Sequence, residues 1–186
     1  MRRVAMFNNV SLDGYFTDGK ADMSWAHSRD DAEWNQFTNE NAGGEAEFLF
    51  GRKTYEMMAG FWPSPQALQM MPTVAKAMNE TRKIVFSRTL TEAKWRNTRL
   101  ARGDLATEVR RMKGEPGPGI LIMGSGEIVS QLTQAGLIDD YQIVTVPVVI
   151  GKGRALFEGV TTRPRLKLTK SRTFSNGNVV SWYQTT

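Results

Sequence analysis

The apolar positions of this chain alternate between short, nearly continuous runs and longer stretches with helical spacing. A short apolar run such as the one from Ile120 to Met123 is typical of a strand buried on both faces of a parallel sheet. Five runs are expected as strands, over residues 3–10, 47–50, 83–86, 119–123 and 140–149. Five stretches are expected as helices, over residues 30–40, 53–59, 73–79, 104–113 and 127–135, the last closed by Gly136. This alternation predicts an α/β fold with a mixed, mostly parallel sheet and helices on both faces.

The end of the chain changes to a period of two. From Leu166 onward apolar and polar residues alternate, Asn176-Gly177 is a turn dipeptide, and an apolar run resumes at Val179. This pattern predicts a C-terminal antiparallel hairpin at the edge of the sheet. The chain shows no internal repeat, and its Pro- and Gly-rich stretches are short. Residues 1–186 are therefore expected to form a single domain.

Composition and charge narrow the chemistry. The chain has no cysteine and one histidine, His27, so disulfides, thiolate sites and His-rich metal sites are excluded, and no metal is expected. The net charge of +5 suits a polyphosphate ligand as well as nucleic acid. Because the basic residues are scattered in ones and twos, we expect no nucleic-acid partner. The first ten residues indicate a strand rather than a signal peptide, and no apolar run approaches the roughly 20 residues of a membrane span. We therefore expect a cytoplasmic protein with no membrane partner.

A Gly-Ser-Gly tripeptide, Gly124 to Gly126, lies between an apolar run and an expected helix. Glycine lets the backbone approach an anion closely, and a helix start offers unpaired N–H groups and the positive end of the helix dipole. Two interpretations follow: a cradle for a pyrophosphate, or a tight turn with Ser125 as the helix N-cap. The tripeptide is not the six-residue Gly-rich dinucleotide fingerprint, which disfavours a standard Rossmann domain.

Two other strand ends carry groups that suit phosphate. Gly51 ends one apolar run, and Arg52 and Thr54 open the next helix, where positive charge needs compensation by a bound anion or by solvent. Ser87 and Arg88 follow another run, and an arginine fork binds phosphate oxygens well. Ligands of open α/β sheets bind outside the carboxyl ends of the strands. Three such ends together predict a cofactor that carries phosphate.

These segments resemble a known family. Leu49 to Tyr55, Lys83 to Arg88 and Ile120 to Gly126 are similar, in the same order, to cofactor-binding segments of dihydrofolate reductases. The resemblance is closer to the reductase half of the bifunctional deaminase–reductase of riboflavin biosynthesis. Val10 to Phe16 resembles its first strand and turn, and Pro147 to Phe157 resembles its late Gly-rich segment, which dihydrofolate reductases lack. The zinc deaminase half has no counterpart here, since its metal signature needs Cys and His residues.

The resemblance implies a dihydrofolate-reductase-like three-layer fold and NADPH as the hydride donor. It also implies the cofactor-binding residues. These are Arg52, Thr54, Ser87 and Arg88 for the 2′-phosphate and neighbouring phosphates, Gly124, Ser125 and Gly126 for the pyrophosphate, and Gly51 beside them. Dihydrofolate reductases have paired glycines where this chain has Gly124-Ser125, so their cis peptide is left open here. The implied substrate is the 5-amino-6-ribosylaminouracil phosphate of riboflavin synthesis, with dihydrofolate second. A non-catalytic NADP- or nucleotide-binding protein is the alternative of another class.

The substrate side offers candidate carboxylates and aromatics. Trp25 followed by Asp30 is similar to the tryptophan and catalytic carboxylate of dihydrofolate reductases, so Asp30 is a candidate proton donor, with Asp31 as its rival. The alternative for both is an ordinary acidic helix start. Asp13 is a second catalytic candidate, against the alternative of Asp-Gly turn chemistry. Trp25 and Trp62 are expected to line the substrate cleft, unless Trp62 merely covers the core.

Related reductase domains are usually dimeric, so the resemblance also implies a homodimer. The apolar run from Val144 to Ile150 is the candidate surface for that dimer. The partners expected are thus a small-molecule substrate and a second copy of the chain.

Overall fold

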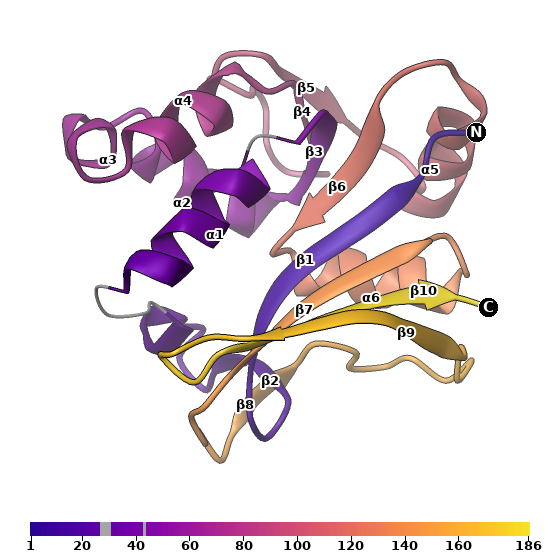
Figure 1. Cartoon of the computed structure of the whole chain (residues 1–186). Coiled ribbons are helices and arrows are strands. Elements are labelled where there is room, and N and C mark those ends of the chain that lie inside the picture. The colour runs from indigo at the N-terminus through magenta and orange to yellow at the C-terminus, as the bar shows by residue number, and fades with distance from the viewer. Residues whose placement is uncertain (27–30, 43) are drawn as a thin grey trace.

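The computed structural model describes residues 1–26, 31–42 and 44–186. Its main sheet has eight strands (Figure 1). From edge to edge they are β5 (Thr98–Ala101), β4 (Lys83–Phe86), β3 (Ala46–Gly51), β6 (Gly119–Met123), β1 (Val4–Ser11), β7 (Asp140–Val146), β10 (Val179–Thr185) and β9 (Leu166–Thr173). The six strands from β5 to β7 are parallel, and β10 pairs antiparallel with both β7 and β9. The mixed, mostly parallel sheet and the C-terminal hairpin are confirmed.

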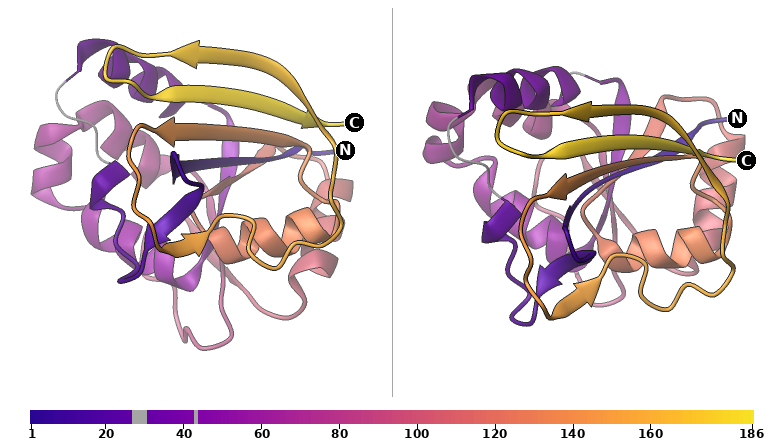
Figure 2. Two further views of the ribbon diagram at one scale, coloured as in Figure 1. Left: turned by 90° about the horizontal axis from the view of Figure 1, so that it is seen from below. Right: turned by 60° about the horizontal axis from the view of Figure 1, so that its bottom comes forward.

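Helices cover both faces of this sheet (Figure 2). They are α1 (Ala32–Ala42), α2 (Arg52–Phe61), α3 (Pro65–Met70), α4 (Pro72–Glu80), α5 (Leu105–Gly114) and α6 (Gly126–Gln134). Alternate residues of a strand point to opposite faces. Leu49 of β3 packs with Val109 of α5 and Leu132 of α6, whereas its neighbour Phe50 packs with Tyr55 of α2 and with α4. The sheet is therefore the middle layer of three.

Helix α1 packs on the other half of the sheet, at β7 and the β9–β10 hairpin. Trp34 and Phe37 of α1 pack on Val144 of β7 and on Phe174 at the turn of the β9–β10 hairpin. The rings of Trp34 and Phe174 meet edge to face, with centroids 5.0 Å apart. These aromatic contacts, which favour such tilted geometries, hold the hairpin against α1.

A second, two-stranded sheet joins two distant segments. Strand β2 (Tyr15–Asp18) pairs antiparallel with β8 (Gly153–Ala155). Gly153 has φ of +159°, and a Cβ on it would lie 1.9 Å from the carbonyl oxygen of Thr17, so only glycine fits there. The backbone N–H of Leu12 also donates to the carbonyl of Val148 over 2.8 Å. The two segments that resemble the riboflavin-pathway reductase therefore lie side by side.

Most expected elements are present, with shifted ends. The runs at 83–86 and 119–123 match β4 and β6, and Gly136, with φ of +65°, ends α6 as expected. The strand expected at 140–149 stops at Val146. Helix α1 begins at Ala32, so Asp31 precedes it, and Asp30, the expected first residue, lies outside the described residues. Strands β2, β5 and β8, the helix α3 and a 3-10 turn, η1 (Ser24–Ala26), were not expected.

The surface expected to form a dimer, Val144 to Ile150, is buried within the chain only at Val144 and Val146. Strand β7 lies between β1 and β10, so Val144 and Val146 point into the core and are 0% and 9% exposed. Val149, beyond the strand, is exposed. A homodimer remains a prediction, but it needs a surface other than β7. Among the described residues, no helix has the length and apolar character needed to cross a membrane.

Candidate functional site

The three strand ends singled out by their phosphate-compatible residues meet at one edge of the sheet, which we call the carboxyl edge. Gly51 of β3 is level with Phe86 of β4, and Leu49 is level with Ile122 of β6, two residues before Gly124. On the other side of β6, Met123 is level with Phe7 of β1. Gly51 is the last residue of β3, and Ser87 and Gly124 directly follow β4 and β6. Because these strands are parallel, the three residues lie at one edge of the sheet.

Two hydrogen bonds connect the loop after β6 to the loop after β3. The backbone N–H of Gly51 donates to Ser125 Oγ over 2.9 Å, and the N–H of Ser125 donates to Thr54 Oγ1 over 3.1 Å. Ser125 has φ of +55° and occupies the N-cap position of α6, but its side chain does not cap that helix. The interpretation of Ser125 as a capping residue is thus wrong, because its hydroxyl is used between the two loops.

Glycine is required on both sides of Ser125. Gly124 has φ of +63°, and a Cβ there would lie 3.0 Å from Thr54 Cγ2. A Cβ on Gly126 would lie 2.8 Å from the ring of Phe16 in β2. These contacts need glycine whether or not an anion binds, and they pack Thr54 and Phe16 against the turn. The described residues contain no cis peptide bond, so the peptide at Gly124-Ser125 is trans.

Two of the helices that begin at this edge, α2 and α6, lack a side-chain cap among the described residues. Neither α2, which follows Gly51, nor α6 has a side chain that accepts from its first turn. By contrast, Asp104 caps α5 by accepting from Thr107 N over 2.8 Å, and Asp31 accepts from Trp34 N at the start of α1 over 3.0 Å. Helix α4 also begins without a cap, at Pro72. First-turn N–H groups have no partner inside the helix, so the starts of α2 and α6 suit an anion.

The cations of this edge differ in their partners. Arg52 Nη1 lies 3.0 Å from Glu56 Oε2, a half-exposed pair within α2. Arg88 is exposed, and Ser87 Oγ beside it accepts from Leu90 N over 2.8 Å, which leaves the hydroxyl proton of Ser87 free to donate. Arg102 also reaches this loop, through a 2.7 Å hydrogen bond to the carbonyl of Leu90.

Sequence reasoning missed Arg102. Strand β5 precedes it, and Ser87 N donates to the carbonyl of Ala101, the last residue of β5, over 3.2 Å. Thr98 to Ala101 is a four-residue edge strand with one buried residue, too short to show a period. The signal that could have found Arg102 was an arginine beside a glycine directly after a short β-type run, as at Gly51-Arg52 in the opposite order.

Asp13 connects the two segments of the small sheet. Its carboxylate accepts from Ser11 Oγ over 2.6 Å and from the backbone N–H groups of Gly151 and Ile150 over 2.8 and 3.3 Å. The hydrogen bond from Ser11, followed by those from the backbone, lowers the pKa of Asp13. The carboxylate is therefore ionised at neutral pH and anchors the β1–β2 turn to residues 150–151.

The candidate proton donor, Asp30, lies outside the described residues, as does His27. Its rival, Asp31, is described. The Asp31 carboxylate accepts from Trp34 N and, over 2.8 Å, from Ser175 Oγ in the hairpin turn. Those two hydrogen bonds lower the pKa of Asp31. Asp31 thus caps α1 and fastens it to the hairpin.

The two tryptophans expected at the substrate cleft lie against different parts of the core. Trp25, in η1, packs on the cluster under α1 and donates from Nε1 to the carbonyl of Asp22 over 3.2 Å. Trp62 packs on the cluster under α2 and α4, with its Nε1 3.0 Å from the sulfur of Met58. The structure does not bring them together as two walls of one cleft. Trp25 lies on the side of Asp31 and α1, whereas Trp62 covers the core, the alternative named for it.

No group of three or more His, Asp or Glu side chains that could hold a metal ion occurs among the described residues. The groups gathered at the carboxyl edge are backbone N–H donors, hydroxyls and guanidinium groups. Such a donor set suits an anionic, phosphate-bearing ligand.

Comparison with known proteins identifies the family. Residues 2–180 match the family model described as the RibD C-terminal domain. The chain belongs to the RibD C-terminal domain family. It is 28% identical to the uncharacterized protein YyaP of Bacillus subtilis (strain 168), over 96% of this chain and 92% of YyaP. The family expected from the sequence segments is thus confirmed for nearly the whole chain.

Solved structures show the fold. A protein of Shewanella sp. PV-4, named as a riboflavin biosynthesis protein, has a TM-score of 0.75 at 20% identity, covering 99% of both chains. A second structure is that of a Thermotoga maritima enzyme, a diaminohydroxyphosphoribosylaminopyrimidine deaminase/5-amino-6-(5-phosphoribosylamino)uracil reductase. Its TM-score is 0.67 at 16% identity, and the match covers 100% of this chain and 57% of that one. Enterococcus faecalis dihydrofolate reductase, complexed with NADP(H) and RAB-propyl, has a TM-score of 0.65 at 11% identity, covering 98% of this chain and 96% of that one. The fold of this RibD C-terminal domain is therefore dihydrofolate-reductase-like.

Proposed function

We propose that this RibD C-terminal domain is an NADPH-dependent reductase whose cofactor lies along the carboxyl edge of the sheet. The observation that carries the proposal is the connection of Gly51 and Thr54 to Ser125, which places the uncapped starts of α2 and α6 side by side at that edge. The family, and the NADP(H) named in the solved dihydrofolate reductase, support the same cofactor.

The residues at this edge fit a dinucleotide that carries an extra phosphate. Backbone N–H groups at the start of α6 would hold the pyrophosphate, with the hydroxyl of Thr54 as a donor, since its oxygen already accepts from Ser125. Arg52, Ser87 and Arg88 would hold the phosphates at the adenosine end, where an arginine fork can bind two oxygens at once. When bound, NADPH supplies the hydride, and the protein supplies alignment and exclusion of water.

The substrate that we propose is a pyrimidine close to 5-amino-6-(5-phosphoribosylamino)uracil, reduced at a polarised C=N or C=O. The support is the family, together with the reductase activity named in the Thermotoga maritima structure. We place this substrate beside Trp25, near the start of α1, and propose Asp30 as the proton donor. Asp13, ionised and bound on both oxygens, has the role of holding the turn after β1 in place.

Binding of the cofactor is tested by titrating NADPH and NADH into the protein while following tryptophan fluorescence and the melting temperature. We expect NADPH to quench the fluorescence and to raise the melting temperature, because a ligand that binds only the folded state stabilises it. The same titration of Arg3→Gln, a change of charge at the other edge of the sheet, should give the wild-type affinity. Saturating NADPH without either effect would show that the cofactor proposal is wrong.

Turnover separates the remaining possibilities. The phosphoribosylaminouracil substrate and dihydrofolate are each supplied with NADPH, and absorbance at the dihydronicotinamide band is followed. Turnover of the pyrimidine supports the proposal. Turnover of dihydrofolate alone would favour a dihydrofolate reductase, the second candidate, which the similarity in fold supports. Tight binding of NADPH without turnover of either would indicate a non-catalytic NADP-binding protein.

A further inference from the structure

Strand β1 extends beyond its pairing with β6. The register of the two strands runs from Val4 with Ile120 to Phe7 with Met123, and Gly124 N then donates to the carbonyl of Phe7. On its other side, β1 remains paired with β7 as far as Ser11 with Val146. From residue 8 to residue 11, β1 therefore has a paired strand on the β7 side and, among the described residues, none on the β6 side. The sheet divides at this point, directly beside Gly124.

The side chain at the division is a buried asparagine. Asn8 is 2% exposed, and its Nδ2 donates to the carbonyl of Gly124 over 3.1 Å. Its Oδ1 is buried and has no hydrogen-bond partner among the residues that the structure describes. Rotating the side-chain amide by 180° would place Oδ1 against the carbonyl oxygen of Gly124, and two acceptors cannot form a hydrogen bond. The hydrogen bond to Gly124 therefore fixes Oδ1 as the atom without a partner. A buried acceptor without a partner costs folding free energy. Because Asn8 Oδ1 lies beside a candidate ligand site, a donor on the ligand would supply the partner that it lacks.

The missing partner is an N–H or O–H donor that can reach between β1 and β6. The pyrophosphate of the proposed cofactor has acceptors but no donor to offer there. The nicotinamide end of NADPH has a flat ring with a carboxamide in nearly the same plane, and that amide carries two N–H donors. A primary amide, which has two N–H donors, suits a lone buried carbonyl oxygen.

We propose that Asn8 is a binding residue for the cofactor, and that its Oδ1 accepts a hydrogen bond from the carboxamide of the dihydronicotinamide ring. This inference rests on the proposed function, because it requires NADPH at the carboxyl edge. The same side-chain amide donates to Gly124, so Asn8 connects the turn that holds the pyrophosphate to the ring that gives up the hydride. Asn8 thereby sets the depth and the rotation of that ring between β1 and β6.

The test compares NADPH with its reduced 3-acetylpyridine analogue, in which a methyl group replaces the amide nitrogen and removes both donors. Dissociation constants are measured by tryptophan fluorescence and by calorimetry on wild type and on Asn8→Leu, without any substrate. Wild type should bind NADPH about tenfold more tightly than the analogue, as loss of one hydrogen bond to a buried acceptor implies. In Asn8→Leu the two dissociation constants should agree within about twofold.

The matched control is Asn178→Leu. Asn178 is also a buried asparagine, 3% exposed, with a side-chain Nδ2 that has no partner, but it lies in the β9–β10 hairpin. This variant should keep the wild-type preference for NADPH over the analogue. If Asn8→Leu does not fold, the comparison on wild type still tests the inference, because equal affinities for the two dinucleotides would overturn it.

Other outcomes are equally definite. If wild type prefers NADPH and Asn8→Leu weakens both dinucleotides by one common factor, the partner of Oδ1 is a water molecule or a ribose hydroxyl, and the inference is wrong. In both of these negative cases the proposed NADPH function stands. If wild type binds neither dinucleotide, the proposed function and the role of Asn8 fail together.

Discussion

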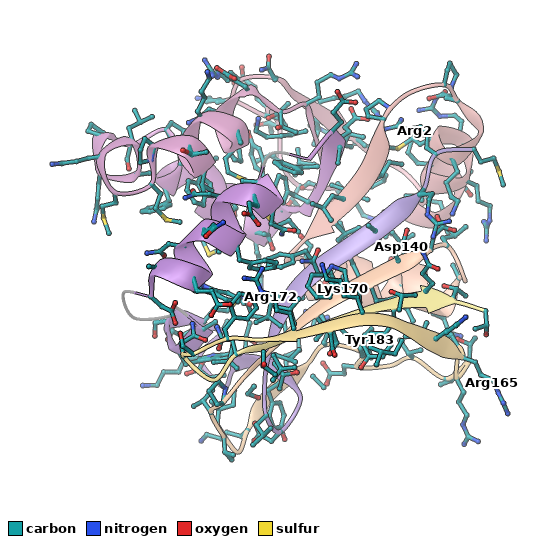
Figure 3. All side chains as sticks on the ribbon, in the orientation of Figure 1. Arg2, Asp140, Arg165, Lys170, Arg172 and Tyr183 are labelled. Carbon is teal, nitrogen blue, oxygen red and sulfur yellow. The ribbon has the colours of Figure 1, made fainter. Side chains whose placement is uncertain are left out.

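Arginine side chains gather at both edges of the parallel sheet, but their partners differ. At the edge where the strands begin, which we call the amino edge, Arg2 lies 2.7 Å from Glu47, and Arg3 binds Asp140 through two hydrogen bonds of 2.7 Å. Figure 3 labels Arg2 and Asp140 at this edge. Lys113 lies 2.5 Å from Asp139. At the carboxyl edge, Arg102 donates to carbonyl oxygens, Arg88 is exposed, and Arg52 has a single carboxylate neighbour in its own helix.

The other polar groups of the two edges also differ in whether the chain itself supplies their partners. Glu108, 19% exposed, lies between Arg99 and Arg111, and Arg111 also contacts Glu115. Arg99, Arg111 and Glu115, together with Arg2 and Glu47, line a hollow of about 380 Å³ at the amino edge. The carboxyl edge has two uncapped helix starts and the unpartnered oxygen of Asn8. Charges that are matched by the chain itself stabilise the fold, whereas polar groups that are left unmatched in the chain leave room for a ligand.

The largest effect is expected from Glu47→Leu at the amino edge. The side chain of Arg2 is 7% exposed, so removal of its carboxylate leaves a buried charge unpaired and should cost about 3 kcal/mol of unfolding free energy. Affinity for NADPH should not change. Urea denaturation and NADPH titration measure the two quantities. The double variant Arg2→Met/Glu47→Leu should regain most of the lost stability, and a parallel loss of NADPH affinity would contradict the separation of the two edges.

Arg88→Ala should produce the opposite pattern. We expect NADPH to bind about thirtyfold more weakly, or about 2 kcal/mol, because a hydrogen-bonded arginine is removed from a phosphate. Binding of NADH should change less than threefold, and the melting temperature should stay within the error of the measurement. Equal losses for NADPH and NADH would show that Arg88 does not read the 2′-phosphate.

Acid should weaken the amino edge through Glu108. Hydrogen bonds from Arg111, and a further one from Arg99, lower the pKa of Glu108 from its ordinary value of 4.5 to about 2. A lowered carboxylate pKa stabilises the folded state at pH values above 4.5, and this contribution disappears as the pH falls from 4.5 towards 2. Glu108→Gln should therefore be less stable than wild type by about 1–2 kcal/mol at pH 7. Urea denaturation at pH 7, 5 and 3 should show the difference shrinking only below pH 4.5, and a constant difference would refute the assignment.

The smallest effect is expected from Glu56→Gln at the carboxyl edge. Glu56 and Arg52 form a half-exposed pair four residues apart, and such a pair contributes about 0.3–0.5 kcal/mol. Its loss should barely change stability, but it releases Arg52 for phosphate, so NADPH should bind about twofold more tightly. Calorimetric titration of both proteins at low salt measures this. Weaker binding of NADPH would mean that Glu56 orients Arg52 towards the cofactor instead of competing for it.

The elements that the sequence predicted well are those with a strong local pattern. Strands β4 and β6 are continuous apolar runs, and their limits match the expected ones. Helix α3 was missed although its signal was present, since Ser64 caps it and Pro65 opens it. Strands β2 and β8 have four and three residues. Neither is long enough to show a period, and they exist only because they pair with each other.

The residues of the candidate site also differ in how well the sequence predicted them. Gly51, Arg52, Ser87, Arg88 and Gly124 were found from the sequence alone, because each follows an apolar run, and the carboxyl ends of parallel strands meet at one edge. The direct roles of these residues towards a cofactor remain predictions.

Tertiary structure alone decided how these residues are used. Ser125 appeared to be a helix cap by sequence, but its hydroxyl accepts from Gly51, 74 positions away. Asp13 is anchored by Gly151, 138 positions away, and Asn8 is buried against Gly124, 116 positions away. Local sequence determines where a strand ends and which groups it carries there. The register between distant strands, which packing of the whole sheet sets, determines which of those groups find partners within the chain and which are left for a ligand.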